Sequence, residues 1–274
     1  MTAKLPSAPL AEVVFEMRWA LQGPPDLPVQ LRNDPGYYVL VDAFGREIAK
    51  DGFSFCREKS GTDPNIIVGQ NVRLQFLKAD DHSFPMFQIG PGVFASNDAT
   101  EYEWASFKKR TVKGIGHLLR SYPNMSSFSF QPVHLELRYT DSFDPDLIGH
   151  GDLLKFINNH TRFSIDIPKR VIGPKCEDAR QGSIMFEFPV SNRKDTNFLF
   201  QLSTGAIGKS STILLISKVR SMSQELQIGR AKKLSANAIG HWLEDAHSVT
   251  SPFFESFVHK RLMSKFKKRT PKKA

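Results

Sequence analysis

The chain has 274 residues, which is enough for one large domain or two modest ones. Its net charge of +9 is concentrated at the C-terminus, because six lysine and arginine residues follow position 264 and leave a charge of +3 for residues 1–264. No apolar run reaches the ~18 residues of a membrane span and the N-terminus lacks the apolar core of a signal peptide, so we expect a cytoplasmic protein that does not bind membranes.

The first predicted element is a strand that contains the pentad FEMRW, Phe15–Trp19. Its apolar and charged side chains alternate, which predicts a buried face with Phe15 and Met17 and an opposite face with Glu16 and Arg18. Short β-rich runs separated by Gly, Pro, Asp and Asn follow it: YYVLVDAFG, GFSFCREKS, PNIIVGQNVRLQFLKAD and SFPMFQIGPGVFASN.

A long helix is expected next. Thr100 and Glu103 fit a capping box, and apolar side chains then recur at helical spacing until Pro123 ends the run. We expect the inner face of this helix to be lined by Trp104, Phe107, Ile115 and Leu118.

A second pentad, LELRY at Leu135–Tyr139, lies 120 residues after the first one. It repeats the same order of apolar, Glu, apolar, Arg and aromatic residues. It predicts another strand with one buried face. If the two pentads are adjacent and antiparallel, Glu16 faces Arg138 and Glu136 faces Arg18, and each pair contributes a few tenths to about 1 kcal/mol.

The alternation of the second strand ends at DSFDPDLIGHG, a segment rich in Asp, Gly and Pro, which suggests a boundary between two structural units near residue 148. We expect a short helix over residues 152–160, then strands at SIMFEFPV, TNFLFQLST and STILLISKVRSMSQ, and a helical close. Within that close, Ser251 and Pro252 fit the cap and the first residue of a last helix.

The predicted fold class is therefore α+β, with two antiparallel-sheet units that are each covered by a long amphipathic helix. The units span residues 1–148 and 149–264, and a basic tail without predicted structure occupies residues 265–274.

Several segments of the chain match one protein family: PLAEVVFEMRW at Pro9–Trp19, QIGPGVFASN at Gln88–Asn97, Tyr102 and Trp104, LELRYTD at Leu135–Asp141 and, less closely, HSVTSPFFESF at His247–Phe257. Through them the chain resembles a sporadically distributed family of uncharacterised prokaryotic proteins whose members open with Pro-Leu-x-Glu-Val-Val-Phe-Glu-x-Arg. The resemblance implies no activity, cofactor or catalytic residue, and the patchy distribution suggests defence-linked gene neighbourhoods.

Two motifs invite a chemical interpretation and do not support it. QLSTGAIGKSST ends like a phosphate loop at Gly208-Lys209-Ser210, but Ser203 replaces the required first glycine and β-rich runs flank the segment, so we expect a hairpin turn. HWLEDAH places His241 and Glu244 one helical turn apart, but an aspartate stands where a second histidine ligand would lie. We predict no catalytic residue, no metal site and no cofactor; the two cysteines are far apart and lack C-x-x-C spacing.

Basic side chains indicate a nucleic-acid surface as an alternative to a protein-binding one. They lie on one helix and in the tail, where solvated charge is the simpler interpretation. The candidates are Lys108, Lys109, Arg110, Lys113, Lys265, Lys267, Lys268 and Arg269, beside the structural Glu/Arg pairs Glu16, Arg18, Glu136 and Arg138.

The sequence favours a non-enzymatic binding or assembly protein that contacts a protein partner. The alternative is a nucleic-acid-binding subunit that uses the tail and the Lys108–Lys113 helix face. An enzyme whose site is assembled from distant residues is a third hypothesis, and the oligomeric state stays open.

Overall fold

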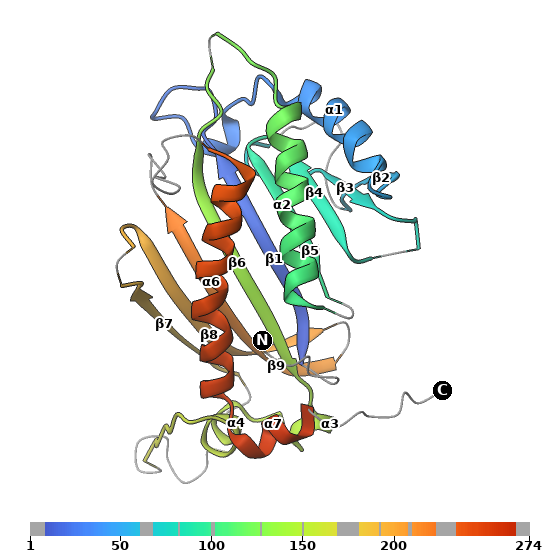
Figure 1. Ribbon diagram of the computed structural model, residues 1–274. Coiled ribbons are helices and arrows are strands. Elements are labelled where there is room, and N and C mark those ends of the chain that lie inside the picture. Colours follow the sequence, from blue (N-terminus) through green and yellow to red (C-terminus); the bar gives the residue numbers. More distant parts are fainter. Residues whose placement is uncertain are drawn as a thin grey trace.

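The computed structural model describes residues 9–60, 68–81, 83–99, 102–126, 128–149, 151–168, 181–191, 193–207, 210–222 and 234–266 (Figure 1). Its nine strands form one antiparallel sheet in the order β2-β3-β4-β5-β1-β6-β9-β8-β7. The strands are β1 (Leu10–Trp19), β2 (Phe55–Glu58), β3 (Leu74–Leu77), β4 (Met86–Gly90), β5 (Val93–Asp98), β6 (Pro132–Phe143), β7 (Ser183–Pro189), β8 (Thr196–Ile207) and β9 (Ser210–Met222).

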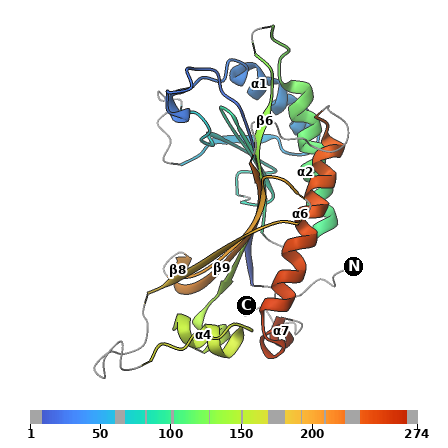
Figure 2. The same cartoon turned by 90° about the vertical axis from the view of Figure 1, so that its left-hand side faces the viewer.

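The two longest helices lie side by side on one side of this sheet (Figures 1 and 2). α2 contacts β5, and α6 contacts β6 and β9. The helices are α1 (Tyr37–Ala49), α2 (Trp104–Ser121), α3 (Pro145–Ile148), α4 (Leu153–His160), α6 (Ala236–Phe257), α7 (Lys260–Phe266) and the short 3-10 helix η1 (Val29–Leu31). No helix among the described residues has the length and apolar character needed to cross a membrane.

The predicted α+β class is confirmed, but the two expected sheets are one. The two pentads lie in β1 and β6, which are adjacent and antiparallel at the centre of the sheet. Each of these strands also pairs with the last strand of its own meander, β1 with β5 and β6 with β9. β6 therefore pairs with strands on both sides of the predicted boundary at residue 148.

The cross-strand ion pairs predicted between the pentads are wrong. Glu16 lies opposite Glu136, and Arg18 lies opposite His134. The ion pairs form within each strand instead, with Arg18 Nε 2.6 Å from Glu16 and Arg138 Nη1 3.1 Å from Glu136. A shift of two residues in register keeps every side chain on the same face, so the alternation of apolar and charged residues cannot distinguish the two registers.

The expectation of a strand at YYVLVDAFG is also wrong, because these residues form most of α1. Tyr37, Leu40, Phe44 and Ile48 are all buried, and their spacing of three or four residues is that of one helical face. The Phe44 ring packs 5.4 Å from Phe76 in β3, so burial of this apolar stripe outweighs the strand propensity of tyrosine and valine.

Two predicted helix starts also differ from the structure. α2 begins at Trp104 with Glu103 as its N-cap, whose carboxylate accepts from the backbone N–H groups of Ala105 and Ser106, and Thr100 lies outside the described residues. Pro252 lies inside α6 rather than at the start of a new helix. The aromatic stripe of α6 continues past the proline, and the Phe253 ring packs 4.9 Å from Phe200, which compensates for the lost backbone hydrogen bond.

The helix at residues 152–160 is confirmed as α4, with Asp152 as its N-cap. The phosphate-loop segment is a hairpin, since β8 ends at Ile207 and β9 starts at Ser210. The core lies between the sheet and α2 and α6, where the predicted Phe15, Met17, Phe107, Ile115 and Leu118 are all fully buried. Trp104 is half-buried against this core.

Candidate functional site: the open face of the sheet

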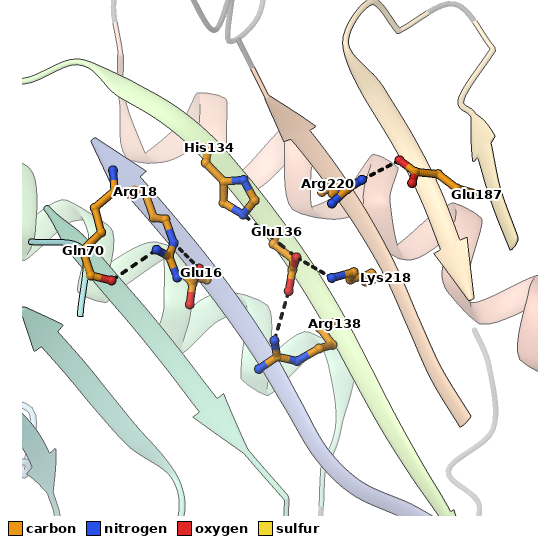
Figure 3. A network of polar contacts seen from close by, with 9 residues as sticks. All are labelled: Glu16, Arg18, Gln70, His134, Glu136, Arg138, Glu187, Lys218 and Arg220. Atoms are coloured by element: carbon orange, nitrogen blue, oxygen red, sulfur yellow. Dashed lines mark hydrogen bonds and ion pairs between the residues drawn. The ribbon is translucent and has the colours of Figure 1, made fainter. Parts of the chain in front are cut away.

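The side of the central strands that points away from α2 and α6 carries a row of charged side chains (Figures 2 and 3). Neither long helix lies on this side. We call this surface the open face, and its members come from β1, β6, β7 and β9: Glu16, Arg18, His134, Glu136, Arg138, Glu187, Lys218 and Arg220.

Glu136 is the centre of the open face, with a side chain only 9% exposed. Its carboxylate lies 3.1 Å from Arg138 Nη1, 3.2 Å from Lys218 Nζ and 4.0 Å from His134 Nε2. Because a carboxylate this buried needs compensation, the surrounding cations are held in place by it. Burial lowers the pKa of His134, so this ring is neutral near pH 7.

A second part of the network anchors a loop to β1. Arg18 Nε bonds Glu16, and Arg18 Nη1 donates to the backbone carbonyl of Gln70 at 3.2 Å. The Gln70 amide in turn donates to the carbonyl of Trp19 at 3.3 Å. Arg18 is therefore fixed from two directions while a third of its side chain stays exposed.

A third part joins β9 to the edge of the sheet. Arg220 Nη2 lies 2.7 Å from Glu187 Oε1 on β7, and the Asn197 amide donates to the same oxygen at 2.7 Å. The hydrogen bond from Arg220 lowers the pKa of Glu187. These three groups of polar contacts thus extend from β1 to β7, although their members are far apart in the sequence (Figure 3).

The open face is almost balanced in charge. Its four arginine and lysine side chains meet three carboxylates, and the histidine is neutral near pH 7. Such a surface offers fixed donors and acceptors at short range without the strong positive potential that a polyanion requires.

The sequence predicted only part of this face. Glu16, Arg18, Glu136 and Arg138 were named from the pentads. Lys218 and Arg220, which bond Glu136 and Glu187, were missed although they alternate with Ser217, Val219 and Ser221, which are buried in β9. That period-two pattern was the available signal.

The basic helix face named as a nucleic-acid candidate is largely neutralised. Lys108 pairs with Glu244 of α6 at 2.5 Å, Arg110 pairs with Asp98, and Lys113 pairs with Asp51. Lys109 is exposed and makes no ion pair within the described part of the chain. These cations therefore join α2 to its neighbours rather than forming a free positive stripe.

The tail candidates are mostly outside the structure. Lys265 ends α7, where its ammonium donates to the carbonyl of Leu147 at 2.7 Å. Lys267, Lys268 and Arg269 lie outside the described residues.

The HWLEDAH segment has structural contacts in place of metal-binding geometry. Glu244 bonds Lys108, which lowers the pKa of this carboxyl, and Asp245 pairs with Arg193. The His247 ring stacks on Trp104 with centroids 3.9 Å apart. Across the described ranges, no three His, Cys, Asp or Glu side chains group as metal ligands would.

A buried chain of hydrogen bonds joins β6 to α6 and to the segment just before α2. The Tyr139 hydroxyl lies 2.9 Å from the Tyr102 hydroxyl and 2.9 Å from His247 Nδ1. Burial raises the pKa of Tyr139 well above its usual value and lowers that of His247, so all three side chains are neutral near pH 7. Sequence reasoning missed this cluster because its members come from three separate segments.

Asp141 is the next inward-facing residue of β6 after Tyr139, and it is 6% exposed. It makes no hydrogen bond or ion pair with any described residue, and burial raises its pKa from 3.8 to about 7. Between about pH 4 and pH 7 the folded state therefore keeps a proton that the unfolded state has lost. The free energy of unfolding should fall as pH rises through that window.

Replacing Asp141 with asparagine should remove this pH dependence. We expect the variant and the wild type to differ little at pH 4, and the variant to be more stable by about 2 kcal/mol at pH 8, allowing for local relaxation around the buried charge. Urea titrations at the two pH values measure the difference. Asp146→Asn on the exposed surface of α3 is the control, and an equal effect from that variant would contradict the assignment.

A search of protein-family models, curated proteins and solved structures finds no match to this chain.

Proposed function

We propose that this chain is a non-enzymatic binding or assembly protein that contacts a protein partner through the open face. The observation that carries the proposal is the row of ion-paired side chains on a sheet face that neither α2 nor α6 covers. Arginines held in place by carboxylates lose little conformational freedom on binding, which favours their use in a protein interface.

Two further observations support a protein partner over nucleic acid. The open face has nearly equal numbers of positive and negative groups, and three basic residues of α2, Lys108, Arg110 and Lys113, already have carboxylate partners on α6, β5 and the loop after α1. We also propose a cytoplasmic setting, as expected from the sequence, and the resemblance to a sporadically distributed prokaryotic family is the basis for proposing that this setting is defence-linked.

An affinity-capture experiment in the native host tests this proposal. Tagged wild-type protein should retain a specific protein, and the double variant Arg18→Ala/Arg220→Ala should retain at least tenfold less of it, as expected if about 1.4 kcal/mol of binding free energy is lost. Lys109→Ala is the control, because Lys109 is an exposed cation on the helix side. Circular dichroism confirms that the variants are folded.

The same proteins should be tested with RNA and DNA at several salt concentrations. Binding that falls steeply with salt and disappears when residues 265–274 are deleted would be non-specific attraction to the tail, in agreement with the proposal. Tight, salt-resistant binding of a defined nucleic acid without the tail would contradict it. Retention of the same protein partner by the double variant would also contradict it.

A further inference from the structure

The strand β7 ends the sheet, and Figure 1 shows no described element beyond it. Met185, Phe186 and Phe188 are 60%, 44% and 47% exposed. These are three of the nine large apolar side chains that the described residues expose, so a seven-residue strand contributes a third of them. Phe163 lies beside Phe186 at 6.3 Å between ring centroids and adds a fourth.

Along this edge the backbone of β7 has hydrogen-bonding groups that no described residue pairs with. The Val190 N–H donates to the Thr196 carbonyl at 2.8 Å, and the Thr204 N–H donates to the Gly182 carbonyl at 3.1 Å. Residues 182 and 190 are therefore hydrogen-bonded to β8, and hydrogen-bonded and non-hydrogen-bonded residues alternate along the strand between them. The even-numbered residues between them therefore point their backbone groups at β8. The N–H and C=O groups of Ser183, Met185 and Glu187 point outward.

This edge lacks most of the features that usually prevent strands from associating. It has no lysine, its one proline is the last residue of the strand, Pro189, and its ladder with β8 runs from Ser183 to Pro189 without a bulge. The only charged side chain, Glu187, is held by Arg220 and Asn197 of its own chain. A second strand therefore meets no unpaired charge.

We propose that β7 pairs with β7 of a second copy of this chain, antiparallel and with the two-fold axis at Phe186. Phe186 of one copy then faces Phe186 of the other, and Ile184 faces Phe188, so apolar side chains meet on the helix side. On the open-face side Met185 faces Glu187, and these two residues exchange their outward backbone hydrogen bonds. A second copy fits because this pairing uses all seven residues and places no like charges opposite each other.

The contact is small. On each copy it buries one strand edge and about half of the Met185, Phe186 and Phe188 side chains. An interface at the low end of the size range gives a weak complex, so we expect a dissociation constant in the micromolar range. The two-fold axis is normal to the sheet, so both open faces lie on the same side of the dimer. This inference does not depend on what the open face binds.

Sedimentation equilibrium of the full chain over about 1 to 200 µM at 150 mM salt tests the pairing. The average mass should rise towards that of a dimer. Met185→Asp places a carboxylate opposite Glu187 twice per dimer and should give a monomer throughout, whereas Met185→Lys should leave a dimer. Met222→Asp is the control, because Met222 is equally exposed but lies on β9 away from the edge.

A disulfide trap tests the register. With Cys56 and Cys176 replaced by serine, Phe186→Cys should form a disulfide-linked dimer on mild oxidation, because directly opposed residues of a non-hydrogen-bonded pair are about 4.5 Å apart at Cα. In the Phe188→Cys variant the new thiol lies opposite Ile184 of the other copy and has no thiol partner. This variant should therefore remain a monomer under denaturing, non-reducing conditions. A wild-type chain that stays monomeric at 200 µM, a Met185→Asp variant that dimerises like the wild type, or a Met185→Lys variant that dissociates would overturn the proposal.

Discussion

Replacing Asp34 with alanine should lower the free energy of unfolding by about 5 kcal/mol, the largest effect that we expect from a single substitution. The Asp34 carboxylate is 4% exposed and accepts four hydrogen bonds. Its donors are Trp19 Nε1 at 3.0 Å, the Tyr122 hydroxyl at 2.6 Å, and the backbone N–H groups of Gly36 at 3.1 Å and Gly92 at 2.9 Å.

These four donors belong to β1, the end of α2, the start of α1 and the turn between β4 and β5. Removing the carboxylate leaves all of them in the interior without an acceptor, and hydrogen bonds to a charged group contribute about 1.5 to 3 kcal/mol each. Asp34→Asn should cost about half as much, because its amide nitrogen replaces an oxygen that accepts two of the bonds. Chemical unfolding measures both values.

Asp26→Ala is the matched control for Asp34, since Asp26 is exposed in the preceding loop and its loss should change stability by less than about 0.5 kcal/mol. Equal stability of the Asp34→Ala variant and the wild type would mean that the four donors find water instead.

Replacing Phe107 with alanine should cost about 3 to 5 kcal/mol, because the ring is fully buried between α2 and the sheet. It lies 5.8 Å from the Tyr102 ring and 6.1 Å from the Trp104 ring, and the Arg110 guanidinium lies over it at 5.7 Å. The substitution therefore opens a cavity beside Tyr102, whose hydroxyl bonds Tyr139.

Urea titration of Phe107→Ala and of Lys109→Ala, two residues further along α2, gives the comparison. Lys109 is exposed, so its replacement should have little effect. A loss well under 1 kcal/mol for Phe107→Ala would show that this helix face does not support the core.

The sequence predicted those elements whose periodicity was unambiguous. Strict alternation identified β1 and β6 and their buried faces, and helical spacing identified α2 and α4. In α1 the composition favoured a strand although Tyr37, Leu40, Phe44 and Ile48 were spaced for a helix, and tertiary burial decided the outcome.

The site was harder to predict than the strands that carry it. Pairing of β6 with β9 brings Lys218 beside Glu136, and no local pattern states which strands will be neighbours. The same reason explains why the partners of Lys108 and Arg110 were missed, since Glu244 is 136 residues from Lys108 and the Asp98 carboxylate is buried at the end of β5. Long-range partners follow from topology, which periodicity alone leaves undetermined.

The central position of β1 has a consequence for synthesis on the ribosome. β1 is the first strand to be made, and β5 can pair with one of its edges once residue 98 has emerged. Its other edge has no partner until β6, residues 132–143, has been made. During that interval the nascent chain exposes an unpaired strand with one apolar face, which is the kind of segment that aggregates or recruits chaperones. A fragment that ends after α2 would keep that edge permanently open, so the two halves should be soluble together rather than apart.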